Sequence, residues 1–323
     1  MAYSSEIVRK ARRRLEESRQ MREAETSARL RQVYEALPRV RQIDSLLRRS
    51  MAMAAQSMFT QGAEDAFLQV RQANQALQQE RQALIDGKFG SGFLDESPIC
   101  ARCGGTGYIG TAMCVCLKEL CRQEQEKELS LLASEEQRFQ NFRLDYYPIQ
   151  PDAKYRVAPR ELMKNNLQIC KDYAENFPAG NLMFIGGTGL GKTFLSACIA
   201  REVAAKGYSV SYETAQSLFS KMEKNQFKPD EGSQQAVNVL LDCDLLILDD
   251  LGTELPGAFV TAALYHVVNS RILNHKSMVI STNLNITDIN SRYSPQIASR
   301  LQGDFKRLTF LGQDIRVLKN RGI

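Results

Sequence analysis

The sequence predicts an α/β fold: a parallel sheet with helices on both faces, preceded by a helical N-terminal region and a small metal-binding module. Short runs in the second half of the chain are apolar throughout, as strands buried on both faces are. They are NLMFIGG, YSVSYET, LLILDDL, SMVISTN and RLTFLG. Helical segments separate these runs, and this alternation is typical of a parallel sheet. Residues 5–87, in contrast, hold almost no strand pattern.

Composition narrows the class of protein. The 323 residues are enough for two or three domains. No apolar run approaches the ~18–20 residues that span a bilayer. The Arg-rich start has no apolar segment behind it, and four glutamates follow it between residues 16 and 25, unlike a secretory or mitochondrial leader. We therefore expect a cytoplasmic protein that does not bind membranes.

Charge is concentrated at the N-terminus. Residues 1–50 carry 13 Lys and Arg against 7 Asp and Glu. Such an arm favours an acidic partner, either nucleic acid or an acidic protein surface. A solvated helix of mixed charge explains the same composition, and the sequence leaves both interpretations open.

The N-terminal region is predicted to be helical. Apolar residues follow helical spacing before and after Pro38, where the chain should break or kink. A further helix is expected from Ala63 to Ile85, closed by Asp86 and Gly87. These helices form a small bundle or offer an apolar face to a partner. We assign residues 1–90 to a region that contacts a partner protein.

Cysteines indicate a metal module rather than disulfides, since five of the eight lie between Cys100 and Cys121. The spacing is C-x2-C-x10-C-x-C, and four thiolates this close suit tetrahedral Zn²⁺. The expected ligands are Cys100, Cys103, Cys114 and Cys116. Cys121 is an alternative to Cys116, and the sequence also leaves open a redox or Fe–S role for these cysteines, or no metal at all. The module spans residues 91–137 and ends in a helix over 117–137.

A phosphate-binding loop is the strongest motif. Gly186–Thr193 reads GGTGLGKT and fits G-x-x-x-x-G-K-[ST]. The apolar strand Leu182–Ile185 precedes it and a helix over 194–204 follows, so backbone N–H groups and the helix N-terminus can surround a phosphate. Lys192 should reach the β- and γ-phosphates and Thr193 should bind Mg²⁺. The expected ATP contacts are Gly186, Gly187, Thr188, Gly189, Leu190, Gly191, Lys192, Thr193 and Phe194.

Acidic residues end a buried strand 57 residues after Lys192. Asp249 is expected to hold Mg²⁺, and Asp250 to orient or deprotonate the attacking water. Asn283 ends the SMVISTN strand and would position that water or cap the next turn. Glu254 is a weaker candidate for the same catalytic work.

Four segments together carry a family resemblance. GGTGLGKT, LLILDDLGTE, VISTN and RYSPQIASRL resemble an AAA+ ATPase of the DnaC/DnaI helicase-loader and IstB group. The resemblance covers residues 138–323 and implies a P-loop ATPase domain. It also implies that Asn283 is the sensor-1 residue, Arg300 an arginine finger for a neighbouring subunit, and Arg316 the sensor-2 arginine. A surface ion pair is the alternative for each of these two arginines. Only seven residues follow Arg316, so a C-terminal helical lid is not expected.

The resemblance implies a bacterial or phage loader of the replicative DnaB-type helicase hexamer. Such a loader binds ATP and single-stranded DNA, self-associates through Arg300 and hydrolyses ATP slowly as a switch. A DnaI-type loader also carries zinc near its N-terminus. Alternatives are an IstB-like transposition helper, whose partner is a transposase, and an adaptor that never hydrolyses its nucleotide. Residues expected to contact DNA are Lys221, Lys224, Phe227 and Lys228, although a plain solvated helix explains them as well.

Overall fold

In the computed structural model, the described residues are 3–57, 63–95, 97–132 and 136–320. The chain forms two compact units. One comprises residues 14–114, and the other joins residues 1–13 to residues 115–323. None of the described helices is long and apolar enough to cross a membrane.

The unit of residues 14–114 is mainly helical. It contains most of α1 (Ser5–Ala36), then α2 (Pro38–Ser57), α3 (Ala63–Phe89) and a hairpin of β1 (Tyr108–Ile109) and β2 (Ala112–Met113). Helix α1 ends just before Pro38, as predicted, because proline fits the first turn of the next helix but not a helix interior.

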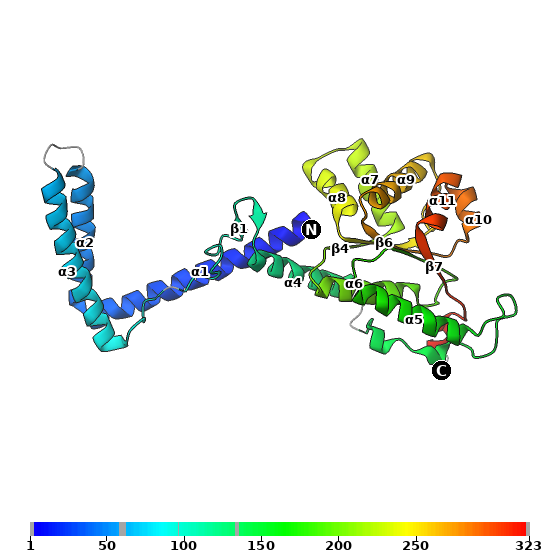
Figure 1. Ribbon diagram of the computed structural model, residues 1–323, viewed down its shortest axis with the longest axis horizontal. Coiled ribbons are helices and arrows are strands. Elements are labelled where there is room, and N and C mark those ends of the chain that lie inside the picture. Colours follow the sequence, from blue (N-terminus) through cyan, green and yellow to red (C-terminus); the bar gives the residue numbers. More distant parts are fainter. Residues whose placement is uncertain (1–2, 58–62, 96, 133–135, 321–323) are drawn as a thin grey trace. The chain divides into compact units, whose positions relative to one another are not determined.

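Helices α2 and α3 lie side by side (Figure 1). Val40 and Ile85 bury their side chains together with Val33 of α1. The predicted end of α3 at Asp86 and Gly87 was wrong. The helix continues to Phe89 and stops at Gly90, whose φ of +89° is the left-handed conformation that ends many helices.

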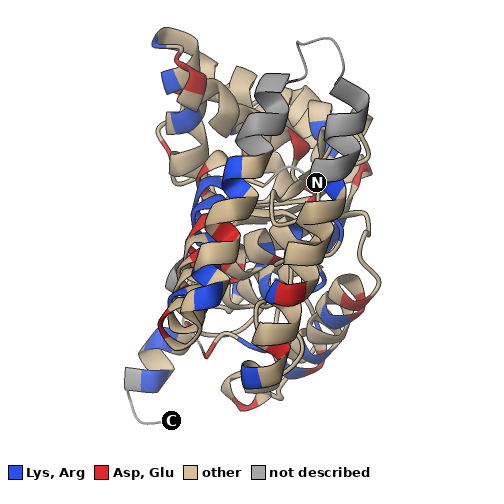
Figure 2. Cartoon of the chain, turned by 90° about the vertical axis from the view of Figure 1, so that its left-hand side faces the viewer, with Lys and Arg blue, Asp and Glu red and all other residues tan. Residues whose placement is uncertain are grey.

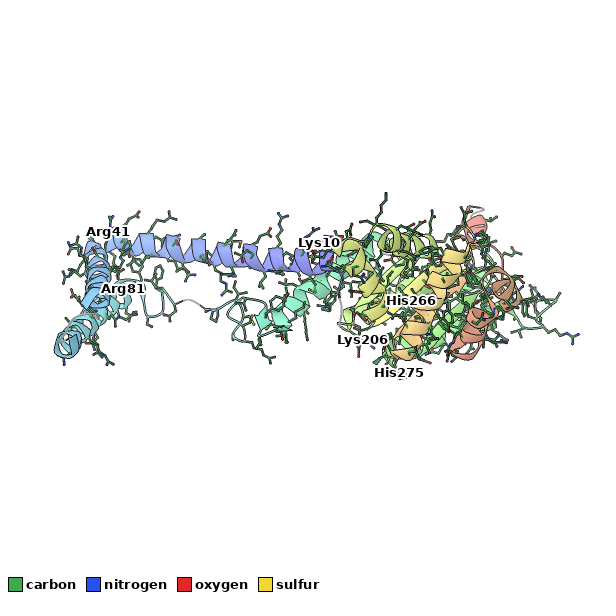
Figure 3. The ribbon with its side chains drawn as sticks, turned by 90° about the horizontal axis from the view of Figure 1, so that it is seen from above. Lys10, Arg41, Arg81, Lys206, His266 and His275 are labelled. Atoms are coloured by element: carbon green, nitrogen blue, oxygen red, sulfur yellow. The ribbon has the colours of Figure 1, made fainter. Side chains whose placement is uncertain are left out.

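Ion pairs cross this helical hairpin. Arg39 contacts Glu80 at 2.8 Å, and Arg81, labelled in Figure 3, contacts Asp44 at 2.7 Å. Positive and negative residues are interspersed on the helices nearest the viewer in Figure 2. The basic residues of this unit are therefore partly neutralised by neighbouring acids.

The other unit contains a five-stranded parallel sheet, as predicted. Its order is β4 (Val210–Thr214), β5 (Leu245–Leu251), β6 (Ser277–Thr282), β3 (Asn181–Ile185) and β7 (Phe305–Thr309). Four of the strands lie within the predicted apolar runs, whereas β7 begins two residues before the run RLTFLG and shares only residues 307–309 with it.

Helices cover both faces of this sheet (Figure 1). On one face lie α4 (Val115–Leu132), α5 (Pro159–Glu175) and α6 (Lys192–Ala205). On the other lie α7 (Ala215–Phe227), α8 (Glu231–Asp242), α9 (Ala258–Leu273), α10 (Ile286–Arg292) and α11 (Pro295–Gly303). Strand β5 shows the alternation that feeds both cores: Ile247 packs with the α5–α6 side, and Leu246 and Leu248 with the α7–α9 side.

Shorter elements flank this sheet. Two 3₁₀ turns, η1 (Phe139–Asn141) and η2 (Leu144–Tyr146), precede α5, and α12 (Ile315–Asn320) follows β7. Helix α4 ends at Leu132, whereas the sequence predicted a helix to residue 137. Residues 133–135 lie outside the described part, and Glu136 and Gln137 are not helical.

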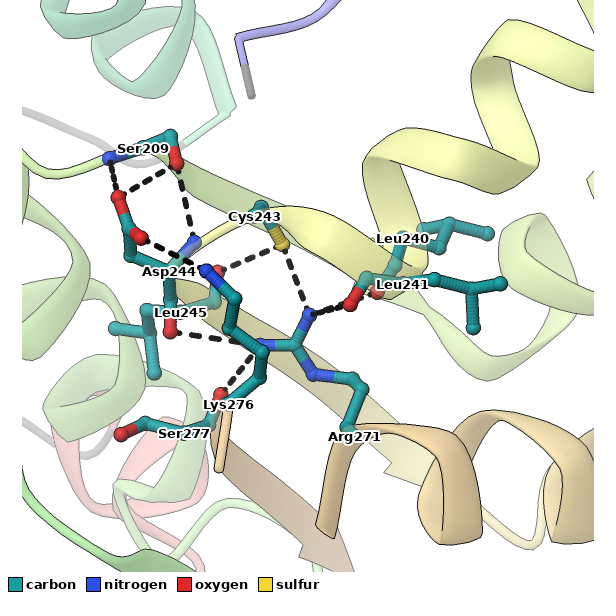
Figure 4. Close-up of polar contacts among 9 residues, drawn as sticks. All are labelled: Ser209, Leu240, Leu241, Cys243, Asp244, Leu245, Arg271, Lys276 and Ser277. Atoms are coloured by element: carbon teal, nitrogen blue, oxygen red, sulfur yellow. Dashed lines mark hydrogen bonds and ion pairs between the residues drawn. The ribbon is translucent and has the colours of Figure 1, made fainter. Parts of the chain in front are cut away.

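A buried arginine joins α9 to the starts of two strands (Figure 4). Arg271 is completely buried and donates to the carbonyls of Leu240 at 2.8 Å and Ser277 at 2.7 Å. The first carbonyl belongs to the last turn of α8, where the helix dipole is negative. Arg271 therefore fixes α8, α9 and β6 to one another.

Candidate functional site

The predicted phosphate loop connects β3 to α6. Gly189 and Gly191 have φ values of +70° and +89°, a conformation that only glycine adopts without strain. A Cβ on Gly186 would lie 2.5 Å from the carbonyl oxygen of Phe310, so this position also has no room for a side chain. The glycines thus serve the backbone path of the loop.

Segments before and after the sheet hold the loop. The Tyr147 hydroxyl donates to the carbonyl of Leu190 at 2.9 Å, and the Ile315 N–H donates to that of Gly189 at 3.0 Å. The sequence analysis gave no role to Tyr147, which lies near the start of the region of family resemblance.

Lys192 lies inside the loop. Its side chain is buried, and its Nζ donates to the carbonyls of Gly186 at 2.8 Å and Gly187 at 2.6 Å. Burial lowers the pKa of Lys192, while the charges of Asp250 and Asp249 act in the opposite direction. The ammonium is therefore held at the centre of the phosphate loop.

Asp249 is fixed by two hydroxyl groups. Tyr212 Oη on β4 donates to its Oδ2 at 3.0 Å, and Ser281 Oγ on β6 donates to its Oδ1. The carboxylate is buried. The sequence analysis gave no role to Tyr212 or Ser281, although Ser281 lies in the VISTN segment that carries part of the family resemblance.

Asp250 points differently from Asp249 because the strand is irregular here. The pairing of β5 with β6 shifts between Leu248 and Leu251, and Asp250 has a φ of +57°. Its backbone N–H donates to Ser281 Oγ at 2.9 Å. Burial and then the charge of Asp249 raise the pKa of Asp250, which suits a proton acceptor.

Several predicted residues line one cavity of about 300 Å³. It is bounded by the loop from Thr188 to Phe194, by Asp250 and Arg316, and by aromatic side chains of residues 142–147. Thr193 also lines a second cavity, of about 420 Å³, together with Asp249. The fold therefore gathers the lysine, threonine, acid pair and Arg316.

Three other candidates lie apart from these cavities. Asn283 is exposed just beyond β6, and Arg300 on α11 contacts Asn269 at 3.1 Å and Asp304 at 3.6 Å. Glu254 is buried and contacts Arg292 and Tyr293. Glu254 thus anchors the loop after β5 to α10, and we assign it no catalytic role.

The residues present fit Mg²⁺. Thr193 supplies a hydroxyl and Asp249 a carboxylate, both oxygen ligands of the kind that this ion prefers. Each Asp249 oxygen accepts one hydrogen bond and keeps a second lone pair for an ion.

The cysteine cluster fits zinc. The Sγ atoms of Cys100, Cys103, Cys114 and Cys116 all lie within 4.8 Å of one another. Cys100 and Cys114 are 3.8 Å apart. Two sulfurs at 2.3 Å from a tetrahedral zinc would be separated by about this distance, ~3.8 Å. The four thiols can therefore share one ion.

Hydrogen bonds to Cys100 favour the thiolate form that binds a metal. Backbone N–H groups of Cys103 and Arg102 lower the pKa of Cys100. Cys121, the alternative ligand, is fully buried outside the cluster, and burial raises its pKa to about 11. The geometry thus selects Cys116. The two histidines, His266 and His275, are exposed in the other unit (Figure 3), and we assign them no role.

Together the sheet order, the loop and the acid pair define a P-loop nucleotide-binding domain. Comparison with known proteins specifies the class further. Residues 154–301 match the family described as IstB-like ATP binding protein. The replicative helicase loader DnaC of Escherichia coli K12 is 26% identical over 151 residues, which cover 46% of this chain and 61% of DnaC.

Two further matches are another DnaC sequence and one solved structure. DnaC of Buchnera aphidicola is 26% identical over 145 residues, covering 43% of this chain and 58% of that protein. A crystal structure of the DnaC helicase loader aligns at 21% identity with a TM-score of 0.44, covering 54% of this chain and 98% of that one. The chain thus matches less than two thirds of these curated relatives' length. Residues 154–301 are thus similar to IstB-like ATP-binding proteins, and a similar share of the chain resembles the DnaC helicase loaders.

Proposed function

We propose that this protein is a cytoplasmic, ATP-dependent loader of a replicative DnaB-type helicase hexamer. The observation that carries the proposal is the convergence of Lys192, Thr193, Asp250 and Arg316 on one cavity in a domain similar to DnaC. ATP hydrolysis would be slow and act as a switch between partner-bound and released states.

In this proposal each residue of the site has a separate role in ATP binding and hydrolysis. The loop N–H groups and Lys192 bind the phosphates of ATP, and Thr193 and Asp249 hold Mg²⁺, which neutralises charge on the phosphates. Asp250 accepts a proton from the attacking water, and Asn283, at the end of the neighbouring strand, orients that water. Arg316 lines the same cavity and stabilises charge on the nucleotide of its own chain.

Arg300 acts on a neighbouring copy in this proposal. It is partly exposed on α11 and lies outside its own nucleotide cavity, where its contacts are Asn269 and Asp304. An arginine in this position supports self-association in which one subunit completes the site of the next.

Single-stranded DNA is the proposed second ligand. Lys221 and Lys224 are paired with Glu213 and Asp230. Phe227 is 65% exposed and lies 5.9 Å from the ring of Phe259, so bases could stack there with Lys228 nearby in sequence. Phe227 is therefore the stronger candidate in this segment.

The remaining parts would serve the partner protein. We assign residues 1–90 to helicase contact, residues 91–137 to a four-cysteine zinc module and linker helix, and residues 138–323 to the AAA+ ATPase domain. Met21 and Leu46 expose 67% and 45% of their surface on the helices of the first region. They are candidates for the helicase interface.

The test is the native mass of the full chain mixed with its host's replicative helicase hexamer, with ATP and with ADP. A defined complex in one nucleotide state is expected. Met21→Glu with Leu46→Glu should weaken it, whereas Leu273→Glu, at a site 65% exposed on α9, should not. Equal effects of both changes would place the interface elsewhere.

Transposition is the second candidate, favoured by the IstB-like match over residues 154–301. Its signature in the same experiment is the lack of a helicase complex in either nucleotide, together with ATP-dependent assembly on duplex DNA. Asp250→Asn separates the loader and the transposition helper from an adaptor that never hydrolyses its nucleotide. Loss of ATP hydrolysis in this variant is expected for the first two, whereas the adaptor has no hydrolysis to lose.

A further inference from the structure

Strand β4 lies at the edge of the sheet, where one side of its backbone has no neighbouring strand. Exposed edge groups normally need other partners. The amide of Gln125 on α4 supplies them: its Nε2 donates to the carbonyl of Tyr208 at 2.9 Å, and its Oε1 accepts from the N–H of Val210 at 2.9 Å. Gln125 is buried. One side chain therefore satisfies two backbone groups at the start of this edge strand.

The start of β4 has a second anchor. The hydroxyl of Tyr3 donates to the carbonyl of Gly207 at 3.1 Å, within the same compact unit. The backbone leading into β4 is therefore fixed by two elements outside the sheet.

Tyr212 lies further along this strand. Val210 and Tyr212 alternate with Ser211, so their side chains share the sheet face on which α4 and α6 lie. Tyr212 is paired in register with Ile247 of β5, two residues before Asp249. Diagonal neighbours at this spacing are within reach of a long aromatic side chain. This register brings Tyr212 Oη to 3.0 Å from Asp249 Oδ2.

The direction of this hydrogen bond is fixed. The hydroxyl of Tyr212 can donate or accept a hydrogen bond, whereas an ionised carboxylate can only accept one. The hydroxyl therefore donates to the carboxylate. Ser281 donates to the other oxygen from β6 on the opposite side. Asp249 is thus held between hydroxyls of its two neighbouring strands.

We propose that Tyr212 is a positioning residue that holds the Asp249 carboxylate in the orientation required for Mg²⁺, and that Gln125 sets the strand from which it acts. The inference rests on the proposed binding of Mg-ATP. Without the phenol, the carboxylate keeps only the hydrogen bond from Ser281 and can rotate about its side-chain bond. The ion then loses a fixed ligand, while the phosphate loop is unchanged.

Tyr212→Phe removes the hydroxyl and keeps the ring. Loss of a group that orients a metal ligand typically costs about 10–100-fold in metal affinity. We expect the Mg²⁺ concentration for half-maximal tightening of a fluorescent ATP analogue to rise about tenfold, with analogue affinity in EDTA unchanged. Tyr208→Phe, on the same face of the same segment, is the matched control and should leave both values as in the wild type.

Gln125→Met tests the role of the strand. It leaves the Tyr208 carbonyl and the Val210 N–H without their amide partner, and it should shift the Mg²⁺ midpoint in the same direction as Tyr212→Phe. Lower thermal stability with an unchanged midpoint would remove Gln125 from the proposal.

The outcomes separate this inference from the function on which it rests. An unchanged Mg²⁺ midpoint in Tyr212→Phe, in a folded protein whose wild type responds to Mg²⁺, would overturn the positioning role. A shifted midpoint without hydrolysis by the wild type would support positioning and refute the ATPase. Wild-type binding that never responds to Mg²⁺ would refute both.

Discussion

Replacing Arg271 by methionine should destabilise the sheet unit. Methionine is unbranched like arginine but shorter, and it has no donors, so the carbonyls of Leu240, Leu241 and Ser277 would lose their arginine partner. All three hydrogen bonds come from the charged guanidinium; the two shortest are 2.8 Å and 2.7 Å long, and a hydrogen bond of this kind contributes about 1.5–3 kcal/mol.

The net loss is smaller than the sum of the two bonds. Burying the guanidinium charge costs several kcal/mol, and this cost disappears with the arginine. Orphaned buried carbonyls cost about 1–3 kcal/mol each. We therefore expect unfolding free energy to fall by about 3 kcal/mol. For a unit of this size that corresponds to a drop in melting temperature of about 6–12 °C, at ~2–4 °C per kcal/mol.

The assay is thermal unfolding followed by circular dichroism, because the chain has no tryptophan. Arg307→Met, at an exposed position on β7, is the matched control and should change stability by less than about 0.5 kcal/mol. The melting temperature of Arg271→Lys should lie between those of Arg271→Met and Arg307→Met, since one ammonium cannot reach both the α8 carbonyls and the Ser277 carbonyl. A melting temperature of Arg271→Met within 2 °C of the control, a limit we set at about the effect of 1 kcal/mol, would refute this account.

Three further predictions concern the ligand sites. Gly189→Ala should weaken nucleotide binding, measured by a fluorescent analogue, because alanine is strained at a φ of +70° and the new Cβ would displace the Asp314 carboxylate, whose oxygen would lie 1.9 Å away. Unchanged affinity would contradict the loop geometry. Cys100→Ser should remove most of an expected single zinc per chain in elemental analysis, whereas Cys170→Ser, a buried site outside the cluster, should keep it. The turnover rate should fall as the pH is lowered through the pKa of Asp250, because a protonated acid cannot accept the water's proton. This pKa is raised above the ordinary value for an aspartate. A pH midpoint of the turnover rate at the ordinary value would exclude Asp250 as the base.

Local patterns in the sequence were sufficient to predict the sheet and the phosphate loop. Each strand is a short apolar run, and the loop needs glycine at positions such as Gly191, whose φ is positive. Both signals lie within a few neighbouring residues. The end of α3 was missed for the same reason: Gly87 looked like a stop, but the helix uses Gly90 instead.

Groups that position the functional residues were not predictable in this way. Tyr212 and Ser281 reach Asp249 from strands 37 and 32 residues away in sequence. Tyr147 reaches the phosphate loop across 43 residues. Such contacts depend on strand order and register, which one sequence does not specify. Arg271, in the last turn of a largely apolar helix, could equally have been an exposed cation near a helix end.

The pairing of β5 with β6 determines how the side chains of Asp249 and Asp250 are oriented. In a regular strand, neighbouring side chains point to opposite faces of the sheet. Asp249 and Asp250 would then lie on different faces and could not act together at one site. The shift between Leu248 and Leu251 turns the chain at this point, and Asp250 takes a positive φ. Ser281 holds both residues, by its hydroxyl to Asp249 and by accepting the N–H of Asp250. The relative orientation of metal ligand and base is therefore set by β6 as much as by the strand that carries them.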